Sequence, residues 1–198
     1  MRLTFSGKSF RSIVILAGTF FLAAVSLPCQ ASPSAAEVYN WGSHQEVSVL
    51  LNQVRTQAGV IRNLADTLDT YNREWPEIGW QINASTLIRL CWHVNALDNT
   101  LFQLQNTKAG ALPWQRKAIK RIAPMVYELT GATDASITQL NENRDHLWAS
   151  GYPGDTDFIY QKANRIAHTM RNFETYAGEM HSARELRETL GLRASTGS

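Results

Sequence analysis

The residues of this chain best suited to metal or acid–base chemistry are its five histidines: His44, His93, His146, His168 and His181. A di-metal four-helix bundle needs a glutamate three residues before a histidine on each of two helices, because that spacing aims both ligands inward. None of the five histidines has a glutamate at that position. Two acid–histidine pairs lie four residues apart, Glu142 with His146 and His181 with Glu185, but this spacing also stabilises ordinary helices. We therefore predict no catalytic residues and no metal site, while both pairs stay open as surface sites.

The two cysteines, Cys29 and Cys91, limit the redox chemistry. No Cys-x-x-Cys-His motif is present, which excludes covalent haem. Non-covalent haem held by a methionine and a histidine stays open, although His168 falls off the apolar spacing of Ile166 and Met170. Cys91 flanks an apolar stripe without a recognisable base arrangement, so it is either a small half-buried hydrophobe or an intermolecular bridge. No cofactor is predicted.

Residues 1–31 have the three-part layout of a secretory signal peptide. The N-terminal segment contains three basic residues and no acid, and an uncharged apolar run follows at 13–25. Small residues after this run allow cleavage after Ala31. The run is shorter than the ~20 residues that span a bilayer as a helix. We predict that the leader is removed and that the working protein is periplasmic or secreted.

Removal of the leader changes the charge of the chain. The whole sequence has 19 basic and 17 acidic residues, and the leader contains three of the basic ones and no acid, which leaves a formal net charge of −1. A nucleic-acid binder needs a sustained positive surface to displace counterions, so we exclude nucleic acid as a partner. No later segment is apolar enough to span a membrane.

Apolar spacing predicts four long helices. Three- and four-residue steps run through 44–74, about 77–107, 114–148 and about 155–190. Pro76, Gly110 with Pro113, and the run at 151–154 mark the turns. The stripes and short connections predict an all-α fold, an up-down-up-down antiparallel four-helix bundle whose third helix is kinked at Pro124. The chain then divides into the signal peptide at 1–31, a lead-in at 32–43, the bundle at 44–190 and a flexible tail at 191–198.

Aromatic residues gather at both ends of such a bundle. They either plug the ends or line an aromatic cleft, because such rings bury large areas. The first end would hold Trp75, Trp80, Trp148 and Tyr152, and the second Tyr39, Trp41 and Trp114.

The outward half of the second helix is a candidate contact surface. With Leu87 and Val94 in the core, the residues Ile88, Trp92 and Phe102 lie on that half. An exposed tryptophan there indicates self-association or binding of another protein. The alternative is that this helix is more deeply buried than the others, or that its aromatic residues cover loops.

A basic cluster opens the third helix and consists of Arg116, Lys117, Lys120 and Arg121. The helix macrodipole disfavours cations at this end. The cluster therefore indicates an anionic partner, such as phospholipid headgroups at a membrane surface. The alternative is a solvated face with acids such as Glu128 nearby.

Three short stretches resemble a loose group of uncharacterised exported helical proteins from bacteria: LPWQR at 112–116, LNEN at 140–143 and FIY at 158–160. The resemblance covers roughly residues 44–190 and implies a helical fold, without an activity or a site. Together these observations predict an exported, non-enzymatic coiled-coil-like bundle that binds itself or an envelope protein. The alternative is a periplasmic bundle that binds a small ligand, haem or a metal.

Overall fold

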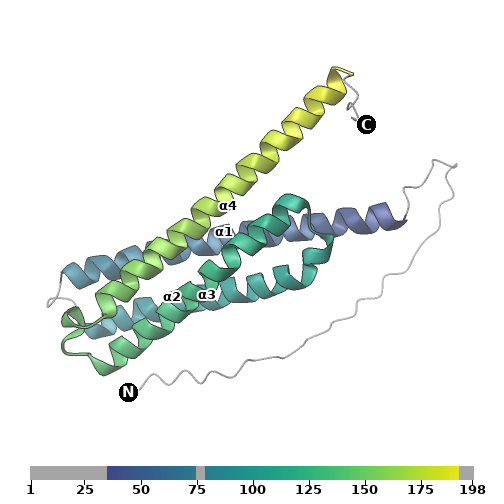
Figure 1. Cartoon of the computed structure of the whole chain (residues 1–198). Coiled ribbons are helices and arrows are strands. Elements are labelled where there is room, and N and C mark those ends of the chain that lie inside the picture. The colour runs from purple at the N-terminus through teal and green to yellow at the C-terminus, as the bar shows by residue number, and fades with distance from the viewer. Residues whose placement is uncertain (1–34, 75–78, 192–198) are drawn as a thin grey trace, which may run out of the picture.

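The computed structural model describes residues 35–74 and 79–191, with side chains from residue 44 onward. Four long helices account for most of this part of the chain: α1 (Ala35–Arg73), α2 (Trp80–Thr107), α3 (Pro113–Glu142) and α4 (Tyr152–Thr189). Two short 3₁₀ helices, η1 (Lys108–Gly110) and η2 (Leu147–Ala149), lie in the connections. The described residues contain no strand, and the helices pack as one bundle (Figure 1). The prediction of an all-helical bundle is confirmed. The predicted signal peptide, the aromatic Trp75 and most of the predicted tail lie outside the described residues.

The apolar stripe of α1 faces the core as its seven-residue spacing predicts. Val47, Val54, Ile61 and Leu68 are fully buried. Their helix packs against both α2 and α4, and α3 also packs against both of these helices. α1 and α3 touch at few places, so they occupy diagonal positions. The helix begins at Ala35, earlier than the predicted stripe at His44.

The end of α3 and the start of α4 differ from the prediction. α3 ends at Glu142 rather than Trp148, because the Asn143 amide turns back to donate to the Gln139 carbonyl and side chain at 3.2 and 3.0 Å. The run at 151–154 opens α4 rather than preceding it. Proline suits the first helical turn, since its ring fixes φ and its missing donor has no partner there anyway. Tyr152 is fully buried, which anchors this turn against the core.

α3 runs continuously through Pro124 and Gly131. Ile122, Val126 and Leu129 stay fully buried across the proline, so the apolar spacing is preserved. Pro124 itself lies on the exposed side, where water can bond the carbonyl that lacks a helical donor.

The last turns of α4 extend beyond the bundle (Figure 1). Met170 is the last fully buried residue of this helix, and every residue from Gly178 to Gly191 is exposed. At ~1.5 Å per residue the projecting part is roughly 20 Å long. Within the described residues, no helix is both long and apolar enough to cross a membrane.

Candidate functional site

The outward half of α2 presents large apolar side chains to solvent. Trp92 is 64% exposed and Phe102 is 58% exposed, while Ile88 is half-buried. They point outward because Leu87, Leu90, Val94, Leu97, Leu101 and Leu104 occupy the inward positions of the same helix, all buried. The outward half of α2 is therefore accessible to solvent at Trp92 and Phe102. We call Ile88, Trp92 and Phe102 the α2 surface.

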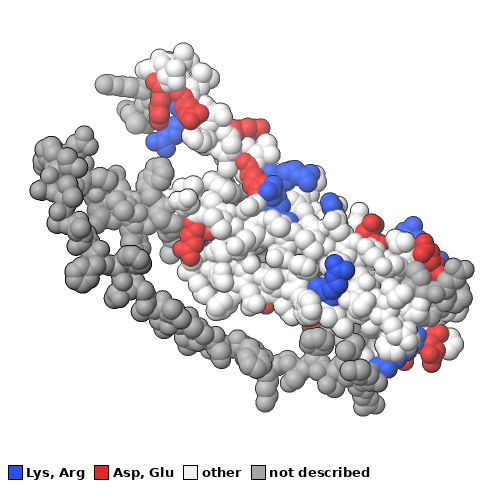
Figure 2. All heavy atoms as spheres, turned by 180° about the vertical axis from the view of Figure 1, so that it is seen from behind, with Lys and Arg blue, Asp and Glu red and all other residues white. Residues whose placement is uncertain are grey.

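The α2 surface lies on a helix with little charge. Between Trp80 and Thr107, Arg89 and Asp98 are the only Lys, Arg, Asp or Glu residues, and asparagine and glutamine supply much of the remaining polar surface. Charges are also sparse over much of the face shown in Figure 2. Depletion of charge together with exposed aromatic rings is the composition of protein–protein interface cores.

The basic cluster divides into residues with different surroundings. All four cations are exposed, and Arg116 donates from Nη1 to the Ala111 carbonyl at 2.8 Å. Lys117 and Arg121 face α4, whereas Lys120 does not line the space between the helices. Among the described residues, none of these three has an ion-pair partner. Glu128, the acid expected beside the cluster, pairs with Lys162 instead.

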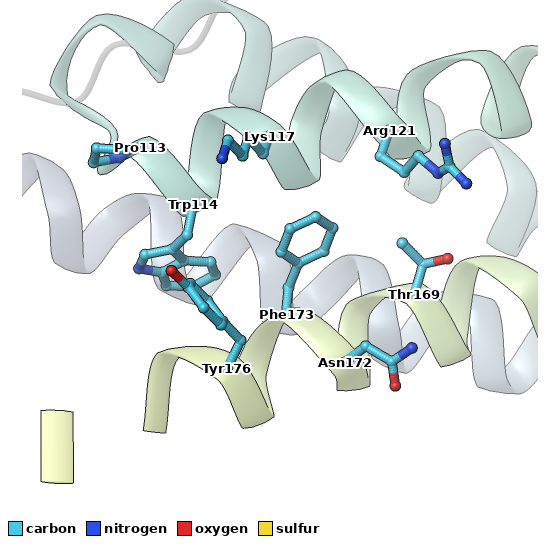
Figure 3. Close-up of a pocket in the computed structure, with 8 residues that line it drawn as sticks. All are labelled: Pro113, Trp114, Lys117, Arg121, Thr169, Asn172, Phe173 and Tyr176. Carbon is cyan, nitrogen blue, oxygen red and sulfur yellow. The ribbon is translucent and has the colours of Figure 1, made fainter. Parts of the chain in front are cut away.

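An open pocket lies between the start of α3 and the middle of α4, with a volume of about 700 Å³ (Figure 3). Four side chains come from each helix: Pro113, Trp114, Lys117 and Arg121 from α3, and Thr169, Asn172, Phe173 and Tyr176 from α4. In Figure 3, Phe173 extends from α4 toward α3, between Lys117 and Arg121. No carboxylate lines the pocket. The sequence indicated the cations but not the α4 side of the pocket, because Phe173 continues the apolar spacing of Ile166 and Met170.

Three of the four aromatic residues predicted for the end where α1 leads to α2 and α3 leads to α4 are described. Tyr152 is fully buried and Trp80 is half-buried, with the Arg144 guanidinium 4.7 Å from the centre of its ring. Trp148 is 55% exposed. At the other end, Trp114 packs half-buried on the core, and the side chains of Tyr39 and Trp41 lie outside the description.

A few buried polar groups lie toward the end of the bundle where α3 leads to α4. Cys91 is buried, and burial, assisted by the negative charge of Asp134, raises the pKa of its thiol to about 11. Burial also raises the pKa of Tyr152, with a smaller contribution from Cys91. The Tyr152 hydroxyl and the Asn83 side-chain amide have no hydrogen-bond partner among the described residues. A thiol with a raised pKa yields little thiolate, so Cys91 has the environment of a buried hydrophobe rather than a nucleophile.

The histidines are dispersed. Glu142 is the last residue of α3 and His146 follows the helix, so the predicted sharing of one helix face by this pair is wrong. His181 and Glu185 face each other at 3.7 Å on the exposed part of α4. Among residues 44–74 and 79–191, no group of three or more His, Cys, Asp or Glu is placed to hold a metal ion. The haem and metal alternatives stay predictions.

No protein-family model, curated protein or solved structure matches the chain.

Proposed function

We propose that this chain is an exported, non-enzymatic helical bundle that acts by protein–protein contact through the α2 surface, with a second copy of itself as the partner. The exposure of Trp92, at 64%, is the observation that carries this proposal. Export is proposed from the leader at 1–31, with a periplasmic or secreted location for the remainder.

The energy available from the α2 surface is large enough for association. A buried aromatic side chain covers about 150–250 Å², and apolar burial contributes about 25 cal/mol per Å². Covering the exposed part of Trp92 is therefore worth about 3 kcal/mol. In a two-fold symmetric contact each copy contributes the same patch, so two tryptophans enter the interface. The scarcity of charge on α2 supports self-contact, because few like charges would oppose one another.

The proposal includes the up-down-up-down order of the helices and a kink at Pro124. Two contacts between α1 and α4 support the order: Asn72 Nδ2 donates to Thr156 Oγ1 at 3.1 Å, and Arg55 pairs with Glu174 at 2.9 Å. The contact nearer the C-terminal end of α1 is thus made with the N-terminal part of α4, as in an antiparallel pair of helices. The missing donor of Pro124 supports the kink.

Light scattering of purified protein tests the self-association. We expect the wild type to be a dimer at micromolar concentration and Trp92→Ala to weaken the dimer at least about 100-fold, or about 2.8 kcal/mol. Trp148→Ala is the matched control, because Trp148 is 55% exposed but belongs to η2 and not to the α2 surface. A monomeric wild type, or equal loss in both variants, would overturn the proposal.

A further inference from the structure

We propose that the open pocket between α3 and α4 binds a small soluble amphiphile with one acidic head group and an apolar body, such as a single-chain alkyl phosphate or carboxylate. This site is independent of the α2 surface. It combines two cations that have no ion-pair partner in the described part of the chain with three aromatic rings. The pocket volume of about 700 Å³ falls within the range of about 300–1,000 Å³ that is common for ligand pockets.

The α3 side of the pocket attracts an anion. Lys117 and Arg121 stand one helical turn apart, and neither has an ion-pair partner among the described residues. Two acids of α3 and α4 are engaged elsewhere: Glu174 pairs with Arg55 and Glu128 pairs with Lys162. An acidic head group would therefore meet attraction and no carboxylate of the lining.

The rest of the lining suits an apolar body. Trp114 and Phe173 are half-buried against the core, and Tyr176, 49% exposed, lines the pocket from α4. An inorganic anion would pair with the cations but leave these rings exposed to water. An uncharged hydrocarbon would cover the rings but remove Lys117 and Arg121 from water without compensation. A ligand with both parts satisfies the whole pocket.

Calorimetry with dodecyl phosphate below its micelle concentration tests the site on the purified protein. We expect one molecule to bind per chain, with Lys117→Gln and Arg121→Gln each weakening binding about tenfold. Lys120→Gln is the matched control, since Lys120 is an exposed cation of the same helix outside the pocket, and it should change affinity less than about twofold. Tyr176→Ala should weaken dodecyl phosphate binding as well, which shows that the apolar lining takes part.

Three outcomes would overturn the proposal. If inorganic phosphate binds as tightly as dodecyl phosphate, the aromatic rings contribute nothing to binding. If uncharged dodecyl maltoside binds as tightly as dodecyl phosphate, the cations contribute nothing to binding. Binding confined to phosphatidylglycerol vesicles, with equal loss in the Lys117 and Lys120 variants, would indicate a bilayer-binding surface rather than a pocket. Trp92→Ala should leave dodecyl phosphate binding unchanged, so failure of the α2 proposal and failure of this one are separate results.

Discussion

Replacing Tyr152 by phenylalanine should raise the free energy of unfolding by about 1 kcal/mol. The side chain is fully buried, and its hydroxyl has no hydrogen-bond partner among the described residues. A buried polar group left without a partner costs about 1–3 kcal/mol. Removing one oxygen leaves a void of about 10 Å³, which at about 24 cal/mol per Å³ costs only about 0.2 kcal/mol. The hydroxyl therefore destabilises the fold more than the void would.

Urea unfolding followed by circular dichroism at 222 nm measures this difference. With a slope of about 2 kcal/mol per molar urea, the midpoint should rise by about 0.5 M at unchanged slope. Tyr127→Phe is the matched control, because Tyr127 is an exposed tyrosine whose hydroxyl accepts from Gln105 Nε2 at 3.0 Å. Its effect should stay within about 0.5 kcal/mol. A loss of 1 kcal/mol or more in Tyr152→Phe would refute the reasoning, since it would reveal a bonded hydroxyl.

Two further predictions concern the thiol and the projecting helix. Burial raises the pKa of Cys91 from 9.0 to about 11, so its contribution to stability is complete below pH 9 and is lost as the pH rises toward 11. The wild type should thus lose up to about 2 kcal/mol more than Cys91→Ala between pH 9 and 11 in urea titrations, and parallel pH profiles would contradict this assignment. Truncation after Gly178 should change the free energy of unfolding by less than about 0.5 kcal/mol, because every removed residue that the structure describes is exposed. A large drop in the thermal midpoint of the truncated chain would show that the projecting turns contact the bundle.

The sequence predicted those parts of the fold that burial alone determines. The seven-residue spacing of Val47, Val54, Ile61 and Leu68 defines one apolar face of α1, and such a face is stable only when it is buried in a core. Helix boundaries were less predictable. Gly151 to Gly154 looks like a turn from residue types, and the burial of Tyr152, a tertiary effect, makes it the start of α4.

The candidate sites were predictable to different degrees. Trp92 is out of phase with the leucines of its own helix, so its outward position follows from local spacing. The pocket does not follow from local spacing, because its α4 side depends on where that helix leaves the bundle. Phe173, Ala177 and Met180 continue the apolar period of α4, yet Met180 is exposed. A periodic stripe reveals which face of a helix is apolar, but it does not reveal how far the neighbouring helices extend along that face.

The placement of the tryptophans has a spectroscopic consequence. Of the four whose side chains are described, Trp92 and Trp148 are exposed and Trp80 and Trp114 are half-buried, so none is sealed in the core. Their native emission should already resemble that of water-facing indoles, and chemical denaturation should shift it little. Tryptophan fluorescence of this protein is therefore a weak reporter of folding and a sensitive reporter of binding. Trp92 should report contact at the α2 surface, and Trp114 should report a ligand in the pocket.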